Sequence, residues 1–352
     1  MKIFTIGFLS CLSALVQLSA CSAAGKNSAP KGIWISREEI MLLPTVGPAW
    51  ENVLKAASLN DGPPNLGGRN QKNDVYTLAR ALVFVRTGMK TMKNVVVDDC
   101  MRIIGTEDNG DALALGRSLP GYVIAADLVG LPPEKEKKFK AWLKTIVTKR
   151  VARGSLRSVH ERRPNNWGMH AGAARIAVAA YLGDKTDLAR AAQVFKGYLG
   201  DRDSYHGFKY GALEWQERPD KPVGINRKGA EKAGYSLDGV LPDDQRRAEG
   251  GFQWPPPKEN YVYEALQGCL VQAVILHRAG FDVWNWEDKA LLRAFRWLHD
   301  VAHFPAVGDD TWQPHLINHY YGTSFPAPVP SSPGKNVGWT EWTHGSLEPI
   351  SR

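Results

Sequence analysis

The residues best suited to chemistry gather in one short stretch, Asn165-Asn166-Trp167-Gly168-Met169-His170. Pro164 before it is typical of the first turn of a helix, so we expect a helix to begin here. On that helix Asn166 and His170 lie one turn apart and share a face. An amide, an imidazole and the arginines just before them are the groups needed to hold a carboxylate and move a proton beside it.

A structural interpretation of the same stretch remains open. Asparagines at a helix start commonly cap backbone N–H groups, and a lone histidine is commonly a core residue bonded to a carbonyl. Taken alone the stretch favours this interpretation. The choice between a structural and a catalytic role therefore depends on the rest of the chain.

A second group of candidates begins at Arg246-Arg247 and continues to Tyr261 and Tyr263. Three prolines at 255–257 predict the start of a helix that runs to about Arg278. Tyr261 and Tyr263 lie on different faces of its first turn, so at most one of them can share a pocket with His170. Either could equally be an ordinary surface tyrosine.

Helical periodicity dominates the chain, and strand-like alternation is scarce. Apolar residues at spacings of three and four predict helices over 74–86, 89–104, 111–129, 134–151, 185–199 and 286–302. We expect an all-α fold of helical hairpins. Residues 153–163 are expected to be a basic, irregular approach to Asn165. Residues 200–257, rich in glycine and proline, form a connection long enough to be functional.

The N-terminus predicts export. Lys2 and the apolar run 3–18 precede Leu18-Ser19-Ala20-Cys21, which has the order of a signal peptide and resembles a lipobox, with ordinary cleavage near Ala23 or Ala24 as the alternative. We therefore expect a signal peptide over 1–21, a lipid anchor at Cys21, and one domain over 22–352 with a proline-rich tail. No later run of apolar residues is long enough to cross a membrane. We expect a periplasmic or secreted protein, tethered or free; the sequence leaves the oligomeric state open.

The net charge indicates the chemical class of the partner, and the cysteine content limits the possible disulfide bonds. The formal net charge is +8, which suits an anionic partner. In an exported protein an acidic polysaccharide is a better fit than nucleic acid, for which the sequence carries no recognised module. Beyond Cys21 only Cys100 and Cys269 remain, as one bridge or as two buried thiols.

His315 and His319 are four residues apart, with Asp309 and Asp310 upstream, a spacing that on a helix can ligate a metal. A third ligand is not evident. We rank a sugar-contacting or structural role above metal binding and expect no metal or organic cofactor.

The Asn-Asn helix, the later Arg and Tyr at a helix start, the export leader and the hairpins together resemble the alginate lyase-type polysaccharide lyases. The resemblance covers roughly residues 60–300. It implies an (α/α) barrel or toroid with long irregular loops over a cleft. It also implies β-elimination of a uronic-acid polymer, in which Asn and often Arg hold the C5 carboxylate, His or Tyr removes the C5 proton, and Tyr protonates O4.

Carried over residue by residue, the family's second Asn is Asn166, but Trp167 stands where the commonest form has His. The resemblance leaves His170 as the candidate base and suggests a branch acting on glucuronan rather than alginate. Tyr261 corresponds to the family's Tyr, and its Arg is Arg247 or Arg246. Further candidates for substrate contact are Asn165, Trp167, Arg163, Arg246, Trp254, Tyr263, His315 and His319.

Two rival functions remain. A glycoside hydrolase would need two carboxylic acids beside the bond, and Glu249, Glu259, Asp309 and Asp310 are available without a spacing that selects a pair. A non-catalytic lipoprotein that binds acidic oligosaccharides is the other.

Overall fold

The computed structural model describes residue 1 and residues 32–211, 213–247 and 251–345. The chain divides into a unit Met1–Pro30 and a unit Lys31–Arg352, and the account below concerns the second. The predicted signal peptide and the proposed lipid anchor at Cys21 lie outside the described residues.

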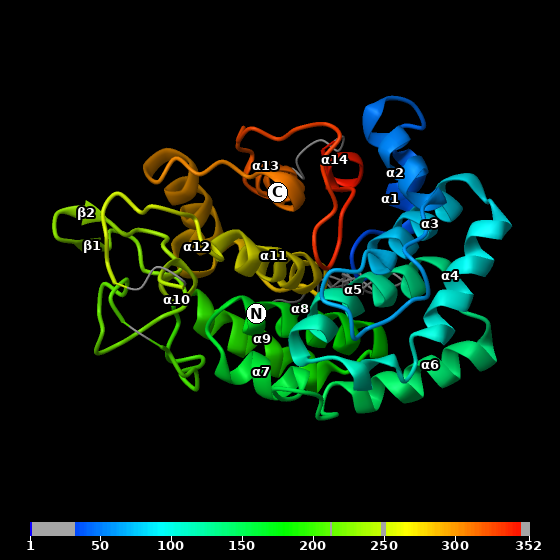
Figure 1. Cartoon of the computed structure of the whole chain (residues 1–352), viewed down its shortest axis with the longest axis horizontal. Coiled ribbons are helices and arrows are strands. Elements are labelled where there is room, and N and C mark those ends of the chain that lie inside the picture. Colours follow the sequence, from blue (N-terminus) through cyan, green and yellow to red (C-terminus); the bar gives the residue numbers. More distant parts are fainter. Residues whose placement is uncertain (2–31, 212, 248–250, 346–352) are drawn as a thin grey trace. The chain divides into compact units, whose positions relative to one another are not determined.

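The described unit is built from helices joined by loops (Figure 1). Its α-helices are α1 (Arg37–Leu42), α2 (Pro48–Ser58), α3 (Asn73–Thr87), α4 (Lys90–Arg102), α5 (Ala112–Val129), α6 (Pro133–Ile146), α7 (Leu156–Arg162), α8 (Asn166–Leu182), α9 (Lys185–Leu199), α10 (Pro242–Gln245), α11 (Val262–Arg278), α12 (Trp286–Arg296), α13 (Gln313–Tyr321) and α14 (Thr340–Thr343). Short helical turns are η1 (Thr106–Asn109), η2 (Val283–Asn285), η3 (Trp297–Val301) and η4 (Gly308–Asp310). Strands β1 (Glu231–Lys232) and β2 (Tyr235–Ser236) form an antiparallel hairpin.

Four helices form the inner row of the unit. Helix α3 packs on α5, α5 on α8, and α8 on α11, while α4, α6, α7 and α9 pack against members of this row from outside. The predicted all-α fold of helical hairpins is confirmed. Amphipathic outer helices covering apolar inner ones are the arrangement that buries both kinds of surface.

Helix α5 is the most apolar element of the described chain. Among the described helices it is the one that is long and apolar enough, by length and composition, to cross a membrane. The lack of long uninterrupted apolar runs in the sequence did not predict this. Within the fold, 94% of its 18-residue span is buried. A helix that is apolar on every side belongs in a core or a membrane, and the burial makes α5 a core helix.

Glycines bring α5 and α11 close to α8 at the level of His170. A Cβ on Gly116 of α5 would lie 2.9 Å from the backbone of Ala171, and one on Gly268 of α11 would lie 2.4 Å from the backbone of Met169. These distances are shorter than any side chain allows. Two glycines therefore fix where the neighbouring helices cross α8.

Several local expectations need correction or completion. Residues 156–162 form helix α7, capped by Ser155, so the expected irregular approach is wrong. The predicted helix over 134–151 ends earlier, at Ile146. Cys100 and Cys269 are buried free thiols. The segment after the proline-rich tail does pack back on the body: Trp339 and Trp342 are buried and donate to the carbonyls of Val75 and Pro44.

Candidate active site

The amino end of α8 is held by two neighbouring aspartates of α10. Asn165 caps the helix by accepting from the Trp167 N–H, and its Nδ2 donates to Asp243 Oδ2 at 2.8 Å. The next residue repeats the pattern, because the Asn166 N–H donates to Asp244 Oδ1 at 3.0 Å. Carboxylates suit a helix N-terminus, where unpaired N–H groups gather.

The two arginines after these aspartates continue the pairing at a spacing of three residues. Arg246 Nη2 lies 3.2 Å from Asp243 Oδ1, and Arg247 Nη1 lies 3.7 Å from Asp244 Oδ1. Arg247 Nη1 also donates a short hydrogen bond to the Asn166 side-chain oxygen. Arg247, the second arginine, is thus hydrogen-bonded to Asn166, the second asparagine.

Hydrogen bonds tie α10 to the start of α11. Gln245 Nε2 donates to the Lys258 carbonyl at 2.8 Å, and Asn260 Nδ2 donates back to the Gln245 carbonyl at 2.5 Å. These bonds bring the Arg247 guanidinium to 4.5 Å from the centre of the Tyr261 ring. Tyr261 is 38% exposed, and its hydroxyl has no hydrogen-bond partner among the described residues.

Asn166, Arg247 and Tyr261 therefore form one contiguous cluster, with an amide, a guanidinium and an accessible phenol. We call it the Asn–Arg–Tyr cluster. Asp244 lies behind it, fully buried, with Oδ2 unpaired. Burial, with the nearby Asp243 charge, raises the pKa of Asp244 well above its usual range.

His170 lies one turn along α8, fully buried. Its Nδ1 is 2.9 Å from Asn336 Oδ1, and the Asn336 amide nitrogen donates to the Gly116 and Arg117 carbonyls. This network assigns the Nδ1 proton to His170 as the donor. The other nitrogen, Nε2, faces Glu264 Oε2 at 3.4 Å. Burial lowers the pKa of His170, which favours the neutral ring.

Glu264 on α11 is the centre of a charge network beside His170. Arg117 Nη2 lies 2.5 Å from Glu264 Oε2, and Lys335 Nζ lies 2.8 Å from Oε1. Burial alone would raise the pKa of Glu264, but the charges of Arg117 and Lys335 hold it well below its usual range. The Glu264 carboxylate is therefore ionised and forms ion pairs with Arg117 and Lys335.

Three guanidinium groups make cation–π contacts with the ring of Trp167. Those of Arg163, Arg69 and Arg153 lie 4.6, 5.3 and 5.5 Å from the ring centre. A tryptophan face attracts cations, so Trp167 gathers positive charge beside the Asn–Arg–Tyr cluster. Burial and the neighbouring guanidiniums of Arg153 and Arg247 lower the pKa of Arg163.

Four of the predicted contact residues have other surroundings. The Tyr263 hydroxyl donates to the Phe304 carbonyl at 2.8 Å and lies 3.1 Å from His299 Nε2, in the core. His315 donates to the Pro328 carbonyl, and the buried His319 packs against Tyr320 and His344. Trp254 stacks on Tyr235 of β2, with ring centres 4.6 Å apart. The structure does not bring these side chains into contact with the cluster.

The acids considered for a hydrolase are engaged elsewhere. Glu259 accepts from the Tyr263 N–H at 2.5 Å, Asp310 accepts from Gln267 and Gln313, and Asp309 pairs with Lys335. Glu249 lies outside the described residues. Among the described residues no group of three His, Cys, Asp or Glu gathers in a way that could hold a metal ion.

Sequence reasoning missed Asp243, Asp244, Glu264, Lys335 and Asn336. For the aspartates a signal was available: Asp-Asp precedes Arg-Arg by three residues, matching the Asn-Asn pair. For Lys335 and Asn336 no local pattern exists, because the tail reaches His170 only through the fold.

The chain is similar to known proteins in part of its sequence and in its fold. The sequence model of the alginate lyase family matches residues 87–204, a segment that holds Asn166 and His170 and ends before Arg247. The fold resembles the crystal structure of an alginate lyase from Bacteroides ovatus, with a TM-score of 0.55 and 14% sequence identity, over 91% of this chain and 100% of the other. No curated protein matches the sequence.

The described residues thus form an all-α fold similar to that of a solved alginate lyase. The match of residues 87–204 to the alginate lyase family model indicates a polysaccharide lyase with an anionic polysaccharide substrate, and the chain resembles that family. The resemblance noted in the sequence is confirmed at that level.

Proposed function

We propose that this enzyme cleaves a uronic-acid polysaccharide, such as alginate or glucuronan, by β-elimination at the Asn–Arg–Tyr cluster. The observation that carries the proposal is the contact of Arg247 with both Asn166 and Tyr261. Three residues from separate parts of the chain meet with the chemical functions that this reaction needs.

The obstacle in the reaction is the weak acidity of the C5 proton, because its removal adds negative charge next to a carboxylate. Asn166 and Arg247 would hold that carboxylate and stabilise the charge as it spreads onto it. The C4–O4 bond then breaks, a C4–C5 double bond forms, and O4 takes up a proton from Tyr261. The electron pair of the C5–H bond becomes the second bond of C4=C5, the C4–O4 pair leaves with O4, and the C5 proton must pass to a base.

The sequence assigned the base to His170, and this role stays a prediction. Its Nε2 faces Glu264 and its ring is fully buried, so a substrate C5 proton could reach it only after that contact opens. Tyr261, by contrast, is 38% exposed. We therefore propose that Tyr261 gives its phenol proton to solvent, takes the C5 proton and returns it to O4, with His170 acting as a positioning residue through its bond to Asn336.

The test is ultraviolet absorbance during incubation with polymannuronate, polyguluronate and glucuronan in turn. Elimination makes a conjugated unsaturated uronate that absorbs, whereas a hydrolase makes only new reducing ends. A rise with one polymer supports the proposal and names the substrate. New reducing ends without absorbance would replace a lyase by a hydrolase.

We also propose that the enzyme works outside the cytoplasm, anchored through Cys21. The support is the leader over residues 1–21 and its Leu-Ser-Ala-Cys ending. Labelled palmitate should enter the wild-type protein in a bacterial host that processes lipoproteins, and should not enter Cys21→Ser.

A further inference from the structure

A second positively charged site adjoins the Asn–Arg–Tyr cluster. It is a cavity of about 580 Å³, which we call the basic pocket. Its charged lining consists of Arg150, Arg153, Arg162, Arg163, Lys209, Arg246 and Asp243. The volume lies within the range of roughly 300–1,000 Å³ that holds small ligands.

The cations of the basic pocket are largely without acidic partners. Asp243 is committed to Arg246 and Asn165. Within the described residues, Arg150, Arg153, Arg162, Arg163 and Lys209 form no hydrogen bond or ion pair with a carboxylate through their side chains. Concentrated charge of one sign in a cavity attracts counter-ions and costs free energy when unoccupied.

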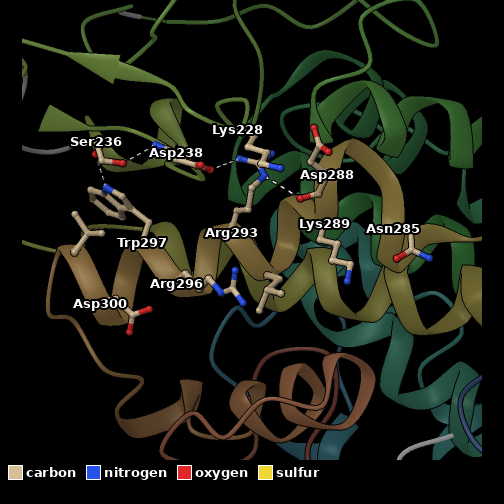
Figure 2. Close-up of a pocket in the computed structure, with 12 residues that line it drawn as sticks. Lys228, Ser236, Asp238, Asn285, Asp288, Lys289, Arg293, Arg296, Trp297 and Asp300 are labelled. Atoms are coloured by element: carbon tan, nitrogen blue, oxygen red, sulfur yellow. Dashed lines mark hydrogen bonds and ion pairs between the residues drawn. The ribbon is translucent and has the colours of Figure 1, made fainter. Parts of the chain in front are cut away.

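Another cavity of about the same volume shows that cations without acidic partners are not a general feature of the surface. The cavity in Figure 2 has a volume of about 590 Å³. Its cations Lys228, Lys289, Arg293 and Arg296 lie among Asp238, Asp288 and Asp300. Arg293 pairs with Asp238 at 2.7 Å and donates to the Asp288 carbonyl. Charges there are mixed, whereas the basic pocket lacks such balance.

The basic pocket is joined to the cluster by a repeated arrangement. Asn165, Asp243 and Arg246 stand one residue before Asn166, Asp244 and Arg247, and in each set the aspartate contacts both the asparagine and the arginine. Asn165 makes its contact through the side chain, and Asn166 makes its contact through the backbone N–H. The later set meets Tyr261, and the earlier set lines the basic pocket together with Tyr210, so the pocket and the cluster lie next to each other.

We propose that the basic pocket is a second anion site, which binds the carboxylates of sugar units next to the unit that is cleaved. The inference rests on the proposed function. A polymer with an acid on every unit presents carboxylates at regular intervals, which the Asn–Arg–Tyr cluster and the basic pocket can hold together. The chemical class of the ligand is a contiguous run of uronates, and the pocket binds without taking part in the bond breaking.

The experiment measures binding by calorimetry in the Tyr261→Phe background, so that ligands stay intact. The probes are dimers and hexamers of mannuronate, guluronate and glucuronate. Arg150 and Arg162 are exposed and make no side-chain hydrogen bond, so Arg150→Gln with Arg162→Gln should leave the fold intact. Arg296→Gln, an exposed arginine of the other cavity, is the matched control.

The double variant should bind the preferred hexamer roughly tenfold more weakly, because charge-assisted contacts are lost, while the dimer changes little. The control should bind like the parent. Equal hexamer affinity in the double variant and the parent overturns the inference, as does failure of all three hexamers to bind the parent. On an otherwise wild-type chain the double variant should raise KM more than it lowers kcat.

The two proposals fail differently. Weakened hexamer binding without any ultraviolet product from the wild-type enzyme would keep the anion site and reject elimination. Ultraviolet product together with unchanged hexamer binding would keep elimination and reject the anion site.

Discussion

Two tyrosines in the first turn of α11 provide a sharp test, because the structure gives them opposite surroundings. Tyr261→Phe removes a hydroxyl that is without a hydrogen-bond partner among the described residues, on a ring that is 38% exposed. Tyr263→Phe removes a buried hydroxyl that donates to the Phe304 carbonyl and contacts His299. The two substitutions delete the same atom two residues apart.

The expected magnitudes follow from these contacts. Tyr261→Phe should change the free energy of unfolding by less than about 0.5 kcal/mol, as for surface substitutions. It should reduce kcat by a factor of about 10² to 10⁴, the range for loss of a general acid or base. Tyr263→Phe should destabilise by about 1–3 kcal/mol, because a buried carbonyl loses its donor, and should keep kcat in the folded fraction.

Both variants are assayed by ultraviolet absorbance on the preferred polymer and by urea unfolding. The reversed pattern, with a stable but inactive Tyr263→Phe and a near-normal Tyr261→Phe, would refute the assignment of proton transfer to Tyr261. Loss of kcat in both would mean that the first turn of α11 acts as a unit.

The remaining predictions concern the neighbours of these residues. Arg247→Lys should lower kcat by roughly 10² to 10³, as expected for a lost donor to developing charge, whereas activity near that of wild type would remove Arg247 from the mechanism. His170→Gln should retain measurable elimination if His170 is only a positioning residue; a complete loss in a folded variant would restore it as the base. Burial raises the pKa of Asp310 to about 8, above its unfolded value, so its contribution to stability is full at acid pH and is lost as pH rises through about 8. The unfolding midpoint of Asp310→Asn should therefore fall less than that of wild type between pH 5 and 9, and parallel curves would contradict this. Treatment with a chelator should leave elimination unchanged, and recovery of lost activity by an added divalent cation would contradict a metal-free mechanism.

The helical fold could be predicted because its signal is local. Repeated apolar spacing marked α3, α4, α5 and α9, since each buries one face or all of its surface. Helix α7 was not predicted because its apolar face consists of only Leu156 and Val159, among charged residues that showed no periodicity. The N-cap residue Ser155 was a signal for its start. Short helices between charged residues carry too little periodicity to be recognised.

Part of the site could be predicted as well. Asn166, Arg247 and Tyr261 were named, and the structure brings them into contact; their roles remain predictions. The choice between Arg246 and Arg247 could not be made from sequence, because it depends on bonds from Gln245 and Asn260 across a loop. A core position for His170 was one of two interpretations of the sequence, and the choice between them could not be made because it depends on Asn336, far along the chain.

The glycine contacts on either side of α8 have a consequence for how this enzyme can diversify. Gly116 and Gly268 leave no room for side chains at the crossings, so the helix that presents Asn166 cannot shift without rebuilding three helices at once. Arg150, Arg162 and Lys209, by contrast, are exposed residues of the basic pocket and take no part in a helix crossing. Exchanging these side chains should thus change substrate preference while the asparagine stays in register, which makes them the place to engineer new specificity.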